Sequence, residues 1–270
     1  MAPAITHFLF GAAVSLLLVV PLALRYDIDR EVALWLIPIG GVWGLFPDVH
    51  HITPVFEAEL YALHNSPWVD LFAFHYTLDR PAVRARYDES VFGSIALFIL
   101  SIATFWGSTH SSATGNRWLR RRPVISLVAM AGGAAYATVA LGVLVSIQDA
   151  FPAVATLVGA DSVLVGGLLV VPLGAGLGVL YAVGLETLSI LEFDPDLPTA
   201  VGAGCAFGVA SWLGGVVVAL PLWLRLVTDA TLSVPFVHAG SLVALVGYGL
   251  VFGVTYALLS GAFHSRAASS

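Results

Sequence analysis

Long apolar runs, separated by short polar segments, fill nearly the whole of the 270-residue chain. A transmembrane helix needs about 20 apolar residues, because it rises about 1.5 Å per residue through a hydrocarbon layer of about 30 Å. The pattern predicts an all-α fold, a polytopic transmembrane helix bundle of about seven spans that forms a single membrane domain, residues 1–270. The expected spans are 4–24, 31–46, 90–110, 124–147, 162–185, 199–223 and 235–260.

Pairs of glycines four residues apart recur within these runs. On a helix such a pair leaves a shallow groove, which lets a second helix backbone approach closely in lipid. The pairs are Gly40 and Gly44, Gly174 and Gly178, Gly204 and Gly208, and Gly249 and Gly253. We expect them to pack helices within one bundle.

A polar loop, residues 47–89, separates the second span from the third. Inside it, Ser66 is a suitable N-cap and Pro67 a suitable first helical residue. Pro81 ends the segment, because the residue before a proline avoids helical geometry. An apolar, aromatic face is formed by Trp68, Leu71, Phe72, Phe74 and Leu78. The pattern predicts a short interfacial helix that covers the ends of the spans.

Composition and charge agree with a membrane protein and exclude some partners. Hydrophobic residues make up 59% of the chain and charged residues 10%, against about 25% charged in soluble domains. The net charge of −6 gives no basic patch for nucleic acid. Arginines cluster at Arg117 and 120–122, and their distribution predicts that the N-terminus and the polar loop face away from the cytoplasm. We expect a multi-pass protein of the cell (plasma) membrane, with membrane lipid as its partner.

Five of the eight histidines lie in or just before the polar loop. They are His7, His50, His51, His64 and His75. Two antiparallel spans place the start of the first and the end of the second on one membrane face. His7, Asp48 and the adjacent histidine pair can therefore converge, and the loop adds the other two histidines with Asp70 and Asp79. Ionisable side chains gathered at a membrane boundary indicate a functional site.

Imidazole and carboxylate groups together suit zinc, manganese or iron. The one cysteine, Cys205, lies in an apolar run, so a cysteine-rich structural zinc site is excluded. An open His/Asp site is typical of catalytic metals, which lower the pKa of a water molecule to about 7. We expect a divalent metal, zinc or manganese. The expected metal ligands are His7, Asp48, His50, His51 and His64, with one of the adjacent pair pointing inward.

His75 and Asp79 are four residues apart, so on a helix they share one face. We expect this pair to act as a general base or to orient a metal ligand. His238 lies near the start of the last span and is a weaker candidate site residue on the same membrane face. His110 ends the third span and His264 lies in the tail, and neither is expected to take part.

Two segments resemble a known family. Residues 5–11 read ITHFLFG and residues 44–51 read GLFPDVHH. They are similar to the motifs of a bacterial and archaeal family of inner-membrane, predicted metal-dependent hydrolases, also described as LexA-binding. The resemblance implies that His7, Asp48 and His51 belong to the site. The chain departs from the family where His50 replaces an aspartate and where His64 lacks the arginine and the Thr-His-Ser element that follow it in the family.

These expectations favour one function and leave a second open. The first is a membrane-bound, metal-dependent hydrolase that acts on a phosphoester or a lipid-derived ester at the membrane surface. The second is a non-enzymatic membrane scaffold or small transport protein with structural or pH-sensing histidines. Spans three to six contain no charged residue, which disfavours a coupled ion path. The oligomeric state stays open.

Overall fold

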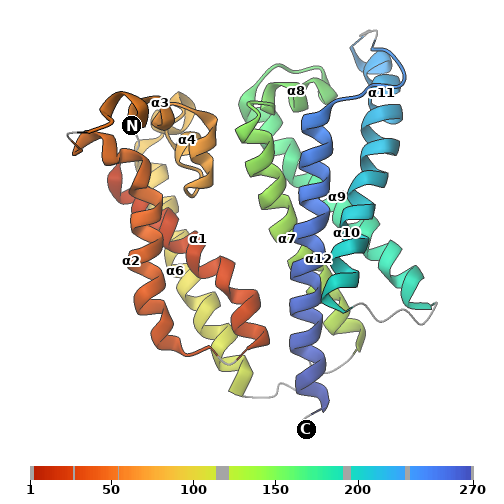
Figure 1. Ribbon diagram of the computed structural model, residues 1–270, viewed down its shortest axis with the longest axis horizontal. Helices are drawn as coiled ribbons and strands as arrows, with labels where there is room; N and C mark the ends of the chain where they lie inside the picture. The colour runs from red at the N-terminus through yellow and green to blue at the C-terminus, as the bar shows by residue number, and fades with distance from the viewer. Residues whose placement is uncertain are drawn as a thin grey trace. The chain divides into compact units, whose positions relative to one another are not determined.

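The structure is a computed structural model that describes residues 3–26, 28–53, 55–113, 122–190, 196–228 and 232–268. These residues are almost entirely helical and contain no strand. They divide into two compact units, Met1–Trp118 with Ser265–Ser270, and Leu119–His264. Figure 1 shows the helices of both units, and each unit is described by itself.

The first unit is built on three long helices, α1 (Ala4–Arg25), α2 (Ala33–Leu45) and α6 (Tyr87–Ala113). Helix α1 packs against both of the others. Its contact with α2 is backbone to backbone, because a Cβ atom on Gly11 would meet the Gly40 carbonyl oxygen and one on Gly44 would meet the His7 carbonyl oxygen. The glycine pair Gly40 and Gly44 therefore packs two helices of one bundle, as its spacing predicts.

Farther along these helices, an apolar core continues away from the glycine contact. It comprises Leu16, Val20, Ala23, Ala33 and Phe105, all buried. A short 3-10 turn, η1 (Arg30–Val32), joins α1 to α2. This core holds together the C-terminal half of α1 and the start of α2, at the opposite ends of these helices from the polar loop.

The polar loop folds into several short helices where the sequence predicts one. They are η2 (Phe46–His51), α3 (Glu57–His64), η3 (Pro67–Leu71), α4 (His75–Leu78) and α5 (Pro81–Arg84). Ser66 and Pro67 do begin a helical turn, but Ala73 and Phe74 have positive φ angles of 53° and 60° and end it. Pro81 begins α5 rather than only closing what precedes it. Proline is favoured at a first helical position, which explains the new start.

The second unit contains the remaining helices, α7 (Arg122–Ile147), α8 (Phe151–Ala155), η4 (Thr156–Val158), α9 (Val163–Ile190), α10 (Leu197–Ser211), η5 (Trp212–Ala219), α11 (Leu220–Val227) and α12 (Ala239–Ala268). Helix η5 is a π-helix that joins α10 to α11. A Cβ atom on Gly204 in α10 would meet the carbonyl oxygen of Gly249 in α12. The glycines of these two helices therefore allow close packing within one bundle.

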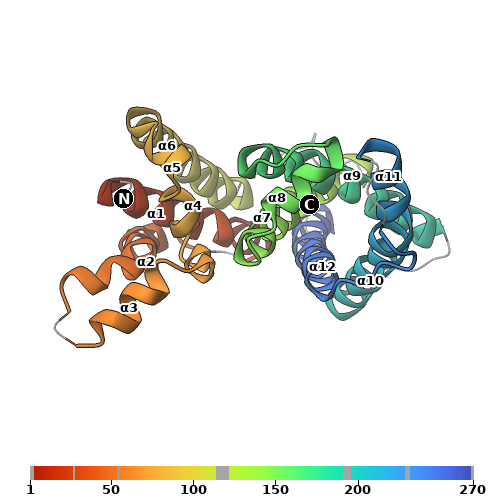
Figure 2. The same cartoon turned by 90° about the horizontal axis from the view of Figure 1, so that it is seen from above.

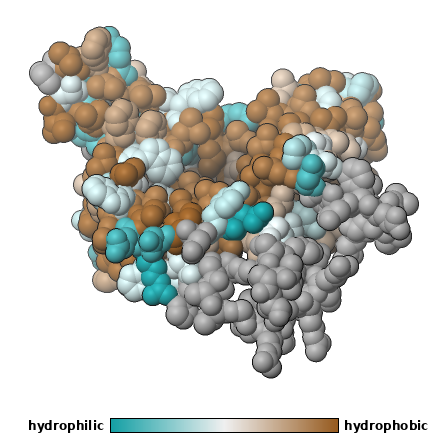
Figure 3. Space-filling view, turned by 60° about the horizontal axis from the view of Figure 1, so that its bottom comes forward, coloured by the Kyte–Doolittle hydropathy of each residue, from teal (hydrophilic) through white to brown (hydrophobic). Residues whose placement is uncertain are grey.

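Within the described residues, seven helical segments are long and apolar enough to cross a membrane. They are Ala4–Arg25, Arg30–His51, Tyr87–Thr109, Val128–Ile147, Val163–Gly184, Leu197–Val227 and Ala239–Ala262. Hydrophobic residues dominate the described part of the face shown in Figure 3. The all-α, polytopic fold predicted from the sequence is therefore confirmed, and the protein is an integral multi-pass membrane protein. The particular membrane and the single-domain organisation stay predictions.

Candidate metal centre

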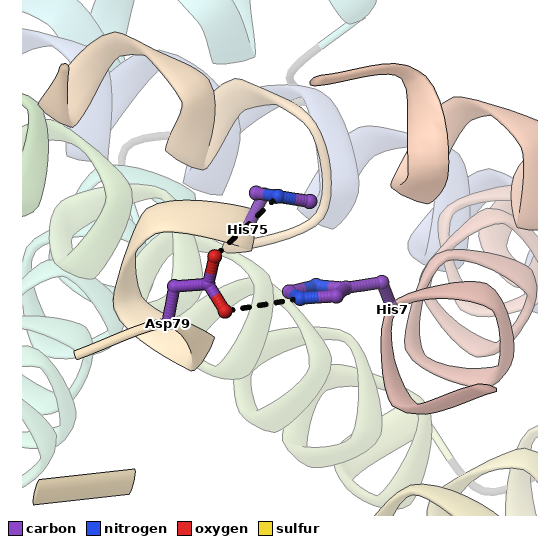
Figure 4. A group of neighbouring side chains, drawn as sticks. All are labelled: His7, His75 and Asp79. Atoms are coloured by element: carbon purple, nitrogen blue, oxygen red, sulfur yellow. Dashed lines mark ion pairs between the residues drawn. The ribbon is translucent and has the colours of Figure 1, made fainter. Parts of the chain in front are cut away.

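Five side chains of the first unit meet at the end of α1 and α2. His7 comes from α1 and Asp48 from η2, while His64 ends α3, His75 begins α4 and Asp79 follows α4. The two carboxylates lie between the three imidazoles. Asp79 faces His7 and His75 in Figure 4, where dashed lines join it to both rings.

The donor atoms of this cluster are closely and evenly spaced. Nε2 of His7 lies 3.4 Å from Oδ1 of Asp79, and Nε2 of His64 lies 3.4 Å from Oδ2 of Asp79. Oδ1 of Asp48 lies 3.3 Å from Nε2 of His75 and 3.6 Å from Nδ1 of His64. Nε2 of His75 lies 3.9 Å from Oδ2 of Asp79. Each carboxylate therefore faces two imidazole rings or more.

Two overlapping groups of these residues could hold a metal ion. One consists of His7, His75 and Asp79, and the other of Asp48, His64 and His75. Within each group the ligand atoms all lie within 4.8 Å of one another. His75 belongs to both groups, so the five residues form one candidate centre.

The spacing fits shared metal ligands better than hydrogen bonds. A hydrogen bond between nitrogen and oxygen is about 2.7–3.2 Å long, and all five of these contacts are longer. Four ligands at about 2.0–2.2 Å from a zinc ion at the corners of a tetrahedron lie about 3.3–3.6 Å apart. Four of the five contacts, at 3.3, 3.4, 3.4 and 3.6 Å, fall in that range.

The polar atoms of the centre are buried away from water and need a hydrogen bond or a cation. His7 is 1% exposed, His75 0% and His64 8%. Within the described residues, no hydrogen bond reaches either ring nitrogen of His7, Nε2 of His75, Nδ1 of His64 or Oδ1 of Asp48. A buried polar atom without a hydrogen bond costs about 1–3 kcal/mol. A divalent cation could satisfy one ring nitrogen of His7 together with Nε2 of His75, and its charge would offset the two negative charges.

The ring of His75 is already oriented for such a role. Its Nδ1–H donates a hydrogen bond of 2.9 Å to the carbonyl oxygen of Gly44. In a neutral ring the proton then resides on Nδ1, and the lone pair of Nε2 points at Asp48. Metal-binding histidines are commonly held in this way by a backbone carbonyl. The ring also stacks on His7, with 3.9 Å between centroids.

The pKa values of His75 and His64 are shifted in opposite directions. Burial lowers the pKa of His75, but the close Asp48 carboxylate, the Gly44 carbonyl and the charge of Asp79 together raise it above the usual 6.5. Burial lowers the pKa of His64, and the charge of His75 lowers it further against the attraction of Asp48. Without a metal, His75 therefore holds a proton more readily than an ordinary histidine, whereas His64 is neutral at pH 7.

Asp70 fixes helix α4 rather than joining the donor cluster. It is 1% exposed, and its two carboxylate oxygens accept hydrogen bonds from the Thr77 amide at 2.7 Å and the Thr77 hydroxyl at 2.6 Å. Thr77 lies midway between His75 and Asp79 on α4. The Asp70–Thr77 contact therefore sets the position of both site residues. No sequence pattern marks a threonine seven residues after an aspartate, so this contact was not predicted.

The adjacent pair His50 and His51 lies beside the centre but outside both metal-capable groups. His50 is buried, and its Nδ1 donates to the Pro47 carbonyl at 2.9 Å. Its ring centroid is 4.5 Å from that of His64. His51 is exposed. One of the pair therefore points inward, as expected for neighbours, and the role of both as ligands stays a prediction.

The other histidines do not enter this centre in the described structure. His238 belongs to the second unit. The side chains of His110, Arg122 and His264, and the residues Arg117, Arg120 and Arg121, lie outside the part of the chain that the structure describes. Comparison of the chain with protein families, with curated proteins and with solved structures finds no match.

Proposed function

We propose that this protein is a membrane-bound, metal-dependent hydrolase that cleaves a phosphoester or a lipid-derived ester at the membrane surface. The observation that carries the proposal is that donor atoms of His7, His75 and Asp79 lie within 4.8 Å of one another, with both imidazoles buried. The resemblance of the two N-terminal motifs to inner-membrane, predicted metal-dependent hydrolases supports the same conclusion.

We assign the metal to His7, His75 and Asp79, the more deeply buried of the two groups. Two histidines and one carboxylate leave a coordination position open, which is the arrangement of catalytic zinc sites. A divalent metal held by these residues would lower the pKa of water to about 7 and would polarise an ester or phosphoryl oxygen. The sequence suggested a different division of roles, with His75 and Asp79 as the general base.

Asp48 and His64 are then not assigned as metal ligands, and they can serve in proton transfer. His64 is neutral at pH 7 because its pKa is lowered, chiefly by burial, and Asp48 lies 3.6 Å from its Nδ1. His64 takes a proton from the attacking water as the water oxygen bonds to the carbonyl carbon or phosphorus. The bond to the alcohol oxygen breaks, and His64 returns the proton to that oxygen.

The position of the centre supports a substrate at the membrane surface. His7 lies near the start of the first span and Asp48 near the end of the second. The loop that supplies most of the centre also exposes large apolar side chains, with Ile52 83% exposed, Phe56 72% and Trp68 60%. Such side chains favour the interface between headgroups and acyl chains.

Metal content tests the proposal directly. We expect about one zinc or manganese ion per chain in detergent-purified protein, measured by mass spectrometry of the metal. Asp79→Asn removes one ligand and should reduce the bound metal at least tenfold. Asp161→Asn, the same change at an exposed loop residue of the second unit, is the matched control and should retain the metal.

Hydrolysis is measured in the same preparations, with p-nitrophenyl phosphate, phosphatidic acid and p-nitrophenyl butyrate as probes. We expect one ester class to be cleaved by the metal-loaded protein, and the rate to fall with Asp79→Asn and with His64→Ala. Wild-type protein without metal would contradict the proposal and favour the scaffold. Stoichiometric metal without hydrolysis of any probe would make the centre structural.

A further inference from the structure

A large, partly open cavity is lined by residues of the second unit, and none of them belongs to the metal centre. Its volume is about 1200 Å³. Helices α7, α8 and α9 line one side, and η5, α11 and the start of α12 line the other. Figure 2 shows these helices arranged around a common centre. Ligand pockets commonly have about 300–1,000 Å³, so this cavity is large enough for a long hydrophobic molecule.

The wall of the cavity is almost entirely aliphatic. Leu141, Val170 and Leu173 on one side face Val216, Ala219 and Leu245 on the other. Among the described residues that line it, none carries a carboxylate, an ammonium or a guanidinium group. Such a wall offers water few of the two to four polar partners that it needs, so it favours an apolar occupant. A charged headgroup inside it would also lack a counter-charge.

The helix that forms one wall is irregular where it meets the cavity. Trp212–Ala219 is a π-helix, and such segments occur often at functional sites. A Cβ atom on Gly215 would meet no atom within 4 Å, so open space adjoins this residue. The chain that follows α11 then runs back along it, since the Phe236 amide donates to the Val217 carbonyl at 3.1 Å.

Non-helical backbone is therefore present beside the interior of a transmembrane span, Leu197–Val227. In a membrane such backbone is tolerated where it is buried or lines a cavity, because lipid offers no hydrogen bonds. The irregular segment thus points to a built binding site rather than a packing gap.

One end of the cavity is polar. His238 accepts a hydrogen bond of 3.1 Å from the Ser241 amide at Nδ1, so Nε2 of the neutral ring carries the proton and can donate. Gln148 uses its amide group to donate to the Leu144 carbonyl at 2.8 Å, which leaves Oε1 to accept. A Cβ atom on Gly240 would meet both Gln148 and His238, so the two side chains are adjacent.

This polar end lies where α7 ends and α12 begins, at an end of the bundle, and the aliphatic wall extends from it along the spans. We propose that the cavity binds an uncharged amphiphile, with a long hydrocarbon chain against the aliphatic wall and an ester, hydroxyl or keto head against His238 and Gln148. A diacylglycerol or a long-chain isoprenoid alcohol has this chemistry. The site is independent of the proposed hydrolase activity.

Trp223 provides the measurement, because it lines the cavity and its indole is fixed by a 2.7 Å hydrogen bond to the Leu157 carbonyl. Bromine on an acyl chain quenches a nearby tryptophan. Full-length protein in phosphatidylcholine nanodiscs is titrated with diacylglycerol, long-chain isoprenoid alcohol or phosphatidylcholine, each brominated on the chain. The contribution of Trp223 is the tryptophan fluorescence of the wild type minus that of the Trp223→Phe variant.

We expect saturable quenching of the Trp223 signal by a neutral lipid at a small fraction of total lipid, and none by the same fraction of brominated phosphatidylcholine. Comparison of the diacylglycerol with the isoprenoid alcohol identifies which of the two lipid classes the cavity binds. Gly215→Leu fills the cavity and should weaken neutral-lipid binding at least fivefold. Gly176→Leu is the matched control, because Gly176 in α9 also has open space beside it but does not line the cavity.

The head contact is tested separately with His238→Ala. Loss of one hydrogen bond should weaken binding of the neutral lipid by about 3- to 10-fold, and should leave quenching by a brominated alkane unchanged. Equal quenching by neutral lipid and phosphatidylcholine, insensitive to both Gly215→Leu and His238→Ala, would overturn the proposal. It would show that the wall contacts only bulk lipid. Val216→Phe fills the same space if Gly215→Leu does not fold.

Discussion

His75 shows how one side chain combines several physical demands. It is fully buried, its Nδ1 donates to the Gly44 carbonyl, and its Nε2 lies 3.3 Å from Asp48. A buried imidazole between two carboxylates needs either a proton or a metal on Nε2. The same contacts that raise its pKa without metal orient the lone pair toward a metal. A proton and a metal ion would therefore compete for one atom.

This competition predicts the pH dependence of metal binding. Because the pKa of His75 is raised above 6.5, a proton must leave Nε2 before the metal binds at lower pH. Metal affinity should therefore fall by about tenfold per pH unit below that pKa, and level off above it. Titration calorimetry at pH 6 in buffers of different ionisation enthalpy should detect about one proton released per ion. Equal affinity at pH 6 and pH 8 would contradict a role for His75 as a ligand.

Thr77 is expected to act through position rather than contact with a metal. Thr77→Val removes the 2.6 Å hydrogen bond to buried Asp70, which should cost about 1–3 kcal/mol. The apparent melting temperature in detergent should fall and the metal dissociation constant should rise. Thr77→Ser keeps the hydroxyl and should restore both. Thr104→Val, at an exposed helix position, is the control, and an equal effect there would disprove the specific role.

At the scale of elements, the centre depends on the close approach of α1 and α2. Glycines at the crossing bring the backbone of η2 beside the start of α1, so Asp48 comes to the face that carries His7. Backbone at positive φ in Ala73 and Phe74 then turns the loop so that α4 enters the same space. Such strain costs about 1–3 kcal/mol per residue. Packing of Phe74 on Phe10, at 6.0 Å between ring centroids, helps to hold it.

Gly44→Ala tests this dependence. The new Cβ would meet the His7 carbonyl oxygen, which is backbone and cannot rotate away. We expect a loss of about 1–3 kcal/mol from overpacking, together with weaker metal binding, because the Gly44 carbonyl also holds His75. Thermal unfolding and metal content measure the two effects.

Gly93→Ala in α6 is the matched control for that substitution. A Cβ atom there would meet nothing within 4 Å, so stability should be unchanged or slightly higher, since alanine is favoured over glycine in a helix by about 0.5–1 kcal/mol. If Gly44→Ala were as harmless as Gly93→Ala, the close approach of α1 and α2 would not be needed for the site.

At the scale of the molecule, seven spans set which loops share a side of the membrane. The polar loop and Asp161 should lie on one side, and Asp196 on the other. The distribution of arginine predicts that the first side faces away from the cytoplasm. Single cysteines test this in a Cys205→Ser background. Glu57→Cys and Asp161→Cys should react with a membrane-impermeant maleimide in intact cells, and Asp196→Cys only after permeabilisation. The opposite pattern would reverse the predicted orientation.

The sequence by itself determined the class of the molecule and the residues that could form its site. Runs of apolar residues long enough to cross a bilayer can adopt few other structures, because lipid offers no hydrogen bonds and the backbone groups must pair within the helix. Histidine and aspartate are rare in such a chain, so their clustering in and before residues 47–89 marked the site without any knowledge of the fold.

The tertiary structure decided how these residues are combined. It brought Asp79 and His75 into the metal-capable groups with His7, left His50 and His51 outside them, and divided the loop into short helices. It also formed the cavity of the second unit from residues that are individually ordinary. The reason is physical: apolar periodicity fixes spans, whereas the direction of a side chain in a loop depends on contacts between distant residues, such as the Gly44 carbonyl with His75 and Asp70 with Thr77.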